Sequence, residues 1–309
     1  MHKIFVNLKR FEVPRKAGGL CPGDNPVKWI ESVIDKTVAF GLGSLDKVQL
    51  AYMLPEGMIA AAAKKVSRFS KSKTKHLAIG CQGVHWEDIR PGMNFGAFTT
   101  SLPAASAKNL GATWAIIGHS EERKAKLQVM QAFEPALQTD IALRTKANAA
   151  VNGLTQAEVL NALQDGLNVL MCVGETAEER GDGTLEEQKP RIEQILKAQV
   201  NAGLTSVVNA GAGRDFVIGY EPVWAIGPGK TPPGKEYIAF VSSLIKAIGK
   251  EGFGLDPTVV YGGGLKEENA AMIASIETIG GGLVGLTCFT GEIGFDVEGL
   301  RTIVEKYLG

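Results

Sequence analysis

Eight short runs of apolar, strand-forming residues recur along the chain, and longer helical patterns separate them. The expected strands are residues 4–7, 48–54, 76–82, 113–118, 167–173, 216–220, 258–261 and 282–286. The expected helices include residues 26–40, 185–200, 235–248, 266–275 and, after the last strand, 297–307. A regular alternation of strand and helix predicts a parallel α/β fold. Because eight parallel strands close a barrel, we expect a (β/α)8 barrel, with an open doubly wound sheet as the alternative.

The length of 309 residues suits one large barrel domain or two ordinary domains. No Pro/Ser-rich linker divides the chain, so we expect a single domain over residues 1–309. Two stretches exceed the regular pattern: residues 11–25, rich in Gly and Pro, after the first strand, and residues 124–151 after the fourth. Both follow the carboxyl ends of strands, which is the face where barrel enzymes place their active sites.

The charge balance argues against two classes of partner. Lys plus Arg equals Asp plus Glu, at 33 each, so we expect neither a nucleic acid nor a membrane surface as the main partner. The four cysteines form no CxxC pair and have no histidine at metal-ligand spacing. Residues 1–7 lack a signal-peptide core, and no apolar run reaches membrane-spanning length. We therefore expect a cytoplasmic protein with reduced thiols and no bound metal.

The segment Gly-Tyr-Glu-Pro-Val-Trp-Ala-Ile-Gly-Pro-Gly-Lys-Thr at residues 219–231 places one carboxylate, Glu221, at the end of a strand. The loop that follows is stiff at Pro222 and rich in glycine, at Gly227 and Gly229. This combination suits a general base that works beneath a closing lid. The alternative is a strand-end glutamate paired with a lysine.

Asn7 and Lys9 lie two residues apart at the end of the first expected strand. Alternate residues of a strand point the same way, so both side chains can face the mouth of the barrel. The ammonium group of Lys9 suits an anionic substrate or a developing oxyanion. The alternative is a surface lysine with no chemical role.

A second polar cluster follows the fourth expected strand. That strand ends at Gly118, and His-Ser-Glu-Glu at residues 119–122 is typical of a first helical turn. His119 would then lie at a helix N-terminus, where the positive end of the helix dipole disfavours an imidazolium ion. We expect a neutral ring that donates a hydrogen bond, with a capping histidine as the alternative.

Three of these segments, residues 7–9, 118–122 and 219–231, resemble the triosephosphate isomerase family in their order and in their strand positions. Residues 172–175, Cys-Val-Gly-Glu, resemble the family's strand-5 signature, and residues 261–263, Tyr-Gly-Gly, resemble its strand-7 turn. The family is itself the established example of a neutral catalytic histidine at a helix N-terminus. The resemblance covers nearly the whole chain and leaves out the two insertions.

The resemblance implies a role for individual residues. It implies Glu221 as the base, His119 as the electrophile, Lys9 and Asn7 as contacts to the substrate and its oxyanion, Gly227 as a lid amide, and Ser120 and Glu121 as supporting residues. It implies glyceraldehyde 3-phosphate and dihydroxyacetone phosphate as the substrate pair, hence glycolysis and gluconeogenesis, with no metal or organic cofactor. It also implies a homodimer.

The expected phosphate site departs from the family. Gly264 stands where the strand-7 turn usually carries Ser, so one hydroxyl is missing. Gly285 is followed by Leu286 where the family usually has paired glycines, so the amide remains while a side chain restricts the backbone. A changed ligand and neutral drift both fit this pattern.

The residues that support the family's dimer also differ. Thr100 and Ser101 lie where Gly and Glu are usual, Glu122 replaces an Arg that pairs with that Glu across the interface, and Gly83 replaces an Asn. We therefore expect a dimer that is weaker or differently docked, with residues 11–25 close to that surface.

The sequence thus predicts an aldose–ketose isomerase that works through an enediolate. One alternative is a paralogous isomerase for another small sugar or sugar phosphate. The other is a catalytically idle barrel used for binding.

Overall fold

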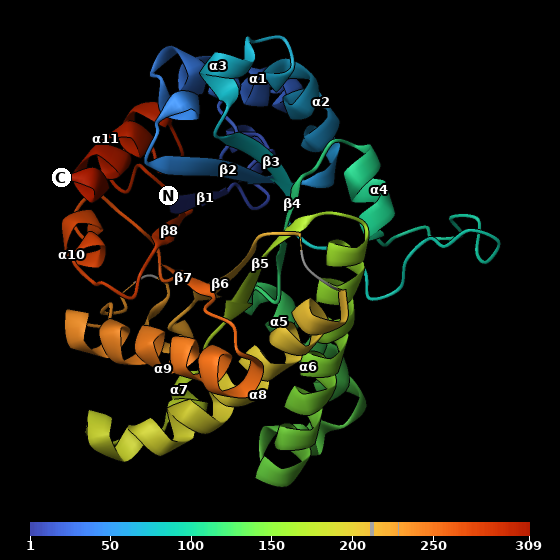
Figure 1. Cartoon of the computed structure of the whole chain (residues 1–309), viewed down its shortest axis with the longest axis vertical. Helices are drawn as coiled ribbons and strands as arrows, with labels where there is room; N and C mark the ends of the chain where they lie inside the picture. The colour runs from blue at the N-terminus through green and yellow to red at the C-terminus, as the bar shows by residue number, and fades with distance from the viewer. Residues whose placement is uncertain (211–212, 228) are drawn as a thin grey trace.

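The computed structural model describes residues 1–210, 213–227 and 229–309. Within these residues eight strands close a parallel barrel in chain order, with β8 beside β1 (Figure 1). The strands are β1 His2–Asn7, β2 Val48–Leu54, β3 Leu77–Cys81, β4 Trp114–Ile117, β5 Asn168–Val173, β6 Phe216–Tyr220, β7 Thr258–Tyr261 and β8 Gly281–Val284. The predicted (β/α)8 TIM barrel is confirmed, and the open doubly wound sheet is wrong because Lys3 of β1 pairs with Gly281 of β8.

Helices cover the outside of the barrel (Figure 1). They are α1 Pro26–Ala39, α2 Glu56–Val66, α3 Lys71–Thr74, α4 Ala104–Asn109, α5 Ser120–Phe133, α6 Ile141–Gln164, α7 Ala177–Arg180, α8 Leu185–Ala210, α9 Lys235–Phe253, α10 Ala270–Ala274 and α11 Val297–Leu308. Short 3-10 turns lie at η1 Arg15–Ala17, η2 Leu42–Ser44, η3 Pro135–Gln138 and η4 Val223–Ala225. Across the part of the chain that is described, none of the helices is long and apolar enough to cross a membrane.

Local sequence explains where these helices begin. The Asn25 side chain accepts a hydrogen bond from the Lys28 amide at the start of α1, and Pro26 occupies the first helical position. The helix then buries Ile30 and Ile34, spaced by about one turn, against the barrel. α1 therefore begins at Pro26, where the expected helix of residues 26–40 begins.

The core has two layers because alternate strand residues point to opposite sides of the sheet. The inner layer fills the barrel with side chains such as Phe5, Met53 and Trp114, and the Phe5 and Trp114 rings meet edge to face at 5.0 Å. The outer, larger layer lies between the strands and the helices. A Cβ on Gly80 would lie 2.6 Å from the Met53 methyl, so this glycine leaves room for the inner layer.

Both expected insertions have structure of their own. The first, residues 11–25, contains η1 and is tied to the segment after β8 by an ion pair between Arg15 and Glu292. The second, residues 124–151, forms most of α5, all of η3 and the first half of α6, which together make a helical hairpin (Figure 1). Phe133 and Ile141 lie exposed on this hairpin.

One expected helix begins later than the pattern indicated. α10 starts at Ala270 and not at residue 266. The Asn269 side chain accepts a hydrogen bond from the Lys266 amide at 2.8 Å and donates one to the Gly264 carbonyl at 3.0 Å. These bonds fix a turn, because Asn offers the backbone an alternative to helical pairing.

Candidate active site

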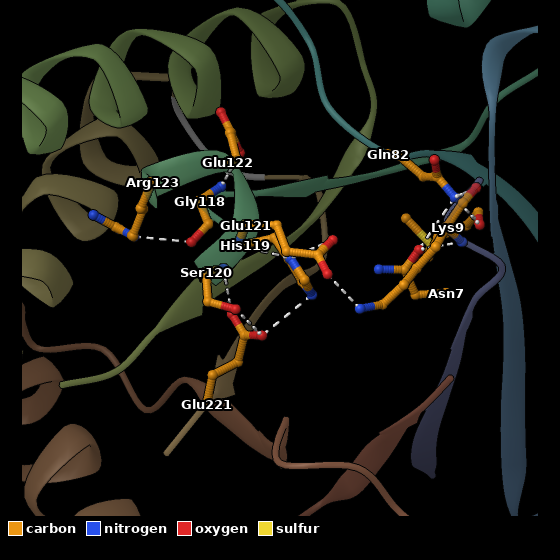
Figure 2. Close-up of polar contacts among 11 residues, drawn as sticks. Asn7, Lys9, Gln82, Gly118, His119, Ser120, Glu121, Glu122, Arg123 and Glu221 are labelled. Carbon is orange, nitrogen blue, oxygen red and sulfur yellow. Dashed lines mark hydrogen bonds and ion pairs between the residues drawn. The ribbon is translucent and has the colours of Figure 1, made fainter. Parts of the chain in front are cut away.

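A cavity of about 1590 Å³ lies at the carboxyl ends of the strands. It is lined by residues that follow β1, β4, β6, β7 and β8, and also by α5, α6 and α8. Asn7, Lys9, His119 and Glu221 all face it, so the structure brings the four expected catalytic residues together (Figure 2).

Glu221 is buried at the end of β6, with 2% of its surface exposed. Its carboxylate accepts a hydrogen bond from the Ser120 amide at 2.9 Å and another from the Ser120 hydroxyl at 3.1 Å (Figure 2). Two glycines leave room for it: a Cβ on Gly174 would lie 1.7 Å from the Glu221 carbonyl oxygen, and one on Gly262 would lie 2.8 Å from Glu221 Cγ. Backbone spacing therefore holds the carboxylate at the mouth of the barrel. The described partners of the Glu221 carboxylate are Ser120 and His119, so the alternative of a glutamate paired with a lysine is not supported.

His119 lies at the N-terminus of α5, as the sequence predicted, and its side chain also caps that helix, which was the alternative. Its Nδ1 accepts a hydrogen bond from the Glu121 amide at 3.3 Å, and its Nε2 lies 3.2 Å from Glu221 Oε1. An Nδ1 that accepts a main-chain N–H carries no proton, so in this arrangement the proton of the ring lies on Nε2. The ring can therefore donate a hydrogen bond from Nε2 into the cavity, where Glu221 lies.

Lys9 takes a left-handed backbone conformation with φ 41°, which is rare outside glycine. Asn7 Oδ1 accepts a hydrogen bond from the Lys9 amide at 3.0 Å, and Gln82 donates to the Lys9 carbonyl at 2.8 Å and to Asn7 Oδ1 at 3.1 Å (Figure 2). Gln82 was missed by sequence reasoning, although a polar residue directly after a buried strand is the signal that could have identified it. Such bonds offset a backbone strain on the order of 1–3 kcal/mol.

The ammonium group of Lys9 contacts Glu121 at 2.6 Å. Burial opposes the ionisation of Glu121, but the hydrogen bond and the charge of Lys9 outweigh it, so the pKa of Glu121 lies below its usual value. Glu121 thus holds the cation beside the cavity.

Gly118, the residue that precedes His119, is held by α5 through both its amide and its carbonyl group. Glu122 accepts a hydrogen bond from the Gly118 amide at 2.7 Å, and Arg123 donates one to the Gly118 carbonyl at 2.8 Å (Figure 2). Glu122, considered from sequence only as a lost interface residue, is therefore turned inward.

A buried carboxyl group lies beneath the start of the expected lid. Glu175 Oε1 accepts hydrogen bonds from Tyr220, Trp224 and Tyr237 at 2.9, 2.8 and 2.8 Å. Burial raises the pKa of Glu175 although these three donors oppose the shift. The 3-10 turn η4, where the expected lid begins, is thereby anchored to the segment after β5 and to α9, and the expected lid residue Gly227 follows it with φ 121°. Pro228 of the lid segment lies outside the described residues.

The four residues expected at a phosphate site, Gly227, Gly264, Gly285 and Leu286, line the same cavity. Leu286 is half-buried. Gly264 has φ 95°, a conformation that L side chains rarely adopt. A serine at Gly264 would therefore be strained in this turn.

No cluster of His, Cys, Asp and Glu that could hold a metal ion occurs in residues 1–210, 213–227 and 229–309.

A closed barrel that gathers a carboxylate, an imidazole and an ammonium group at the carboxyl ends of its strands has the architecture of a (β/α)8 enzyme. The profile of the triosephosphate isomerase family matches residues 43–292. Triosephosphate isomerase from Alkaliphilus metalliredigens is 34% identical over 226 residues, which cover 72% of this chain and 75% of that protein. The enzyme from Chloroherpeton thalassium is 35% identical over 212 residues, 68% of this chain and 70% of the other. A crystal structure of triosephosphate isomerase from Bartonella henselae shares the fold with a TM-score of 0.64 at 21% identity, and covers 100% of this chain and 99% of that one. The chain belongs to the triosephosphate isomerase family and is an isomerase.

Proposed function

We propose that this chain interconverts glyceraldehyde 3-phosphate and dihydroxyacetone phosphate by proton transfer through an enediolate. The observation that carries the proposal is the convergence of Glu221 and His119, with 3.2 Å between Oε1 and Nε2, beside Lys9 in one cavity. A base must lie beside a donor that can polarise the substrate carbonyl, and these residues supply both.

In this proposal Glu221 removes the proton from the substrate carbon next to the carbonyl group. His119 donates from Nε2 to the oxygen on which negative charge develops, and Lys9 adds a positive charge nearby. Asn7 holds Lys9 in its left-handed conformation through the Lys9 amide. Glu221 then returns the proton to the neighbouring carbon, which completes the isomerisation. A base typically contributes 10²–10⁴-fold to such a reaction.

The lid would close over the bound substrate and exclude water from the reactive enediolate. Supporting this, Trp224 at its start is held by Glu175 at 2.8 Å, which gives the lid an anchored hinge. The Gly227 amide would then contact the phosphate group, together with amides of the strand-7 and strand-8 turns.

A second candidate is an isomerase of the same kind that acts on a larger sugar phosphate. The cavity of about 1590 Å³ exceeds the usual range of about 300–1000 Å³ for small-molecule sites. The cavity is lined by α5, α6 and α8 as well as by the strand ends, and Leu286 lies at the expected phosphate turn.

The two candidates are separated by kcat/KM for both triose phosphates, for tetrose phosphates and for the neutral sugars. We expect the highest value for glyceraldehyde 3-phosphate. A tetrose phosphate turned over more than about 100-fold better, a difference of roughly 2.7 kcal/mol in transition-state binding, would assign the enzyme to the second candidate.

We further propose a single (β/α)8 domain that works in the cytoplasm as a homodimer with altered contacts. Supporting this, Glu122 is engaged with Gly118 and not free for an interface, and Phe95, 90% exposed after β3, is available for one. We expect light scattering to show dissociation on dilution. A dimer intact at low nanomolar concentration would contradict the weakened interface.

A further inference from the structure

Two carboxyl groups and one ammonium group form a cluster between α5 and α6. Glu122 Oε2 accepts from the Gly118 amide at 2.7 Å, while its Oε1 lies 2.5 Å from Lys126 Nζ. The same ammonium group lies 2.6 Å from Glu158 Oε1. The cluster therefore runs from the interior of α6 to the peptide that precedes His119.

Glu158 is 2% exposed, and its Oε2 finds no hydrogen-bond partner in the described parts of the chain. A buried carboxylate oxygen without a donor is costly, whereas a carboxylic acid carries less charge to desolvate. Burial, with the charge of Glu122 added to it, raises the pKa of Glu158 to about 9, although Lys126 opposes the shift.

Glu122 has the opposite preference. Burial again opposes ionisation, but the charge of Lys126 and the hydrogen bonds from Lys126 and the Gly118 amide outweigh it, so the pKa of Glu122 lies below its ordinary value. At neutral pH the cluster thus holds one carboxylate, one carboxylic acid and one ammonium ion.

We propose that Glu122 is a positioning residue for His119, and that protonated Glu158 and Lys126 keep Glu122 in place. The ionised carboxylate fixes the Gly118 amide, and Arg123 fixes the Gly118 carbonyl, so the left-handed turn at Gly118, φ 71°, is held from both sides. This turn sets the position from which the His119 ring enters the cavity. The expected change in kcat rests on the proposed function, whereas the expected change in the position of His119 does not.

The charged neighbours are consistent with this arrangement. Arg123 on α5 interacts with the charges of Glu122 and Glu158, and also with Glu221 at the end of β6. Cys172 on β5 is buried, and burial first of all raises its pKa well above the ordinary value, so it stays a neutral thiol. Ionisation of Glu158 would therefore place a second negative charge beside Glu122 and draw Lys126 away from it.

The kinetic test compares Glu122→Ala, Glu122→Gln and Glu158→Gln with wild type between pH 6 and pH 10. We expect Glu122→Ala to lower kcat for glyceraldehyde 3-phosphate between about tenfold and about 100-fold with little change in KM, because misplacing His119 weakens the transition state. Glu122→Gln should recover part of the loss, because its amide oxygen can still accept from the Gly118 amide. The control is Glu305→Ala, which breaks the exposed pair with Arg301 on α11 and should leave kcat unchanged.

Glu158→Gln mimics the protonated acid, so it should match wild type at pH 7 and keep its activity above pH 9, where wild type declines. Its stability gives a second readout. The folded-state pKa of about 9 lies above the unfolded value of about 4.3, so the stabilising contribution of the proton is present below about pH 4.3 and is lost as pH rises to about 9. The Tm of Glu158→Gln relative to wild type should therefore increase across this window.

Nuclear magnetic resonance of the enzyme without substrate separates this inference from the proposed function. We expect the Gly118 amide proton and the His119 ring nitrogens to shift in Glu122→Ala, and the Gly118 amide to titrate near pH 9 in wild type but not in Glu158→Gln. Should wild type lack triose phosphate activity, the proposed function falls and these shifts still decide the positioning role. Two results together would overturn the positioning role. The first is unchanged Gly118 and His119 resonances in folded Glu122→Ala, or in Glu122→Gln should the alanine variant not fold. The second is an alkaline decline that Glu158→Gln retains.

Discussion

Ser120 donates a hydrogen bond to each carboxylate oxygen of Glu221, from its amide to Oε2 at 2.9 Å and from its hydroxyl to Oε1 at 3.1 Å. Ser120 is the first residue of α5, so the positive end of the helix faces the carboxylate as well. The residue next to His119 thus holds the base. Glu221 must leave these donors, at least in part, to reach a substrate carbon.

Replacing Ser120 by Ala tests this contact. The amide bond remains and the hydroxyl bond is lost, and a hydrogen bond to a charged group is worth about 1.5–3 kcal/mol. Because one donor survives, we expect kcat/KM to fall by about tenfold, the low end of that range. Steady-state kinetics on the purified variant measures the change, with exposed Ser275→Ala as the control. Kinetics equal to wild type would show that the hydroxyl has no part in placing the base.

Gly174→Ala should damage the site through the backbone. Its Cβ would lie 1.7 Å from the Glu221 carbonyl oxygen, so β5 and the end of β6 would have to separate. We expect a fall in Tm and a loss of kcat well beyond that of Ser120→Ala. The matched control is Gly153→Ala in α6, whose Cβ meets nothing within 4 Å and which should gain about 0.5–1 kcal/mol of stability. An alanine at Gly174 with unchanged Tm and kcat would contradict the close packing of these strands.

The two turns expected to bind phosphate should respond differently to substitution. Gly264→Ser should lower stability by about 1–2 kcal/mol, because φ is 95° there, and the strain should prevent it from improving KM. Leu286→Gly frees the strand-8 turn and should lower KM for glyceraldehyde 3-phosphate. Kinetics and thermal unfolding of the two single variants and the double variant measure both effects. A Gly264→Ser protein with unchanged Tm and a lowered KM would show that the missing hydroxyl alone had weakened the site.

The barrel could be predicted because its strands are short apolar runs between regular helices. The bounds of β2, β6 and β7 agree with the expected ranges, since apolar periodicity is a local property. The start of α10 could not be predicted, because the side-chain bonds of Asn269 decide it and they depend on where the chain turns.

The site likewise contains residues that could be placed from sequence and residues that could not. Glu221 and His119 could be placed from sequence because each follows a strand in a short motif. The cluster of Glu122, Lys126 and Glu158 could not, since Glu158 lies on another helix and its contact depends on how α6 packs against α5. Nothing in the local sequence around Glu122 shows whether it faces the barrel or the solvent.

The central claim is that Glu221 is the base of a triose phosphate isomerase. The most direct measurement is kcat for glyceraldehyde 3-phosphate in wild type and in Glu221→Gln, a variant that keeps the shape of the side chain and cannot accept the proton. We predict a fall in kcat of at least about 10²-fold, in line with the contribution of a general base, with little change in KM and with Tm near that of wild type. A folded Glu221→Gln enzyme that turns over at the wild-type rate would contradict the account.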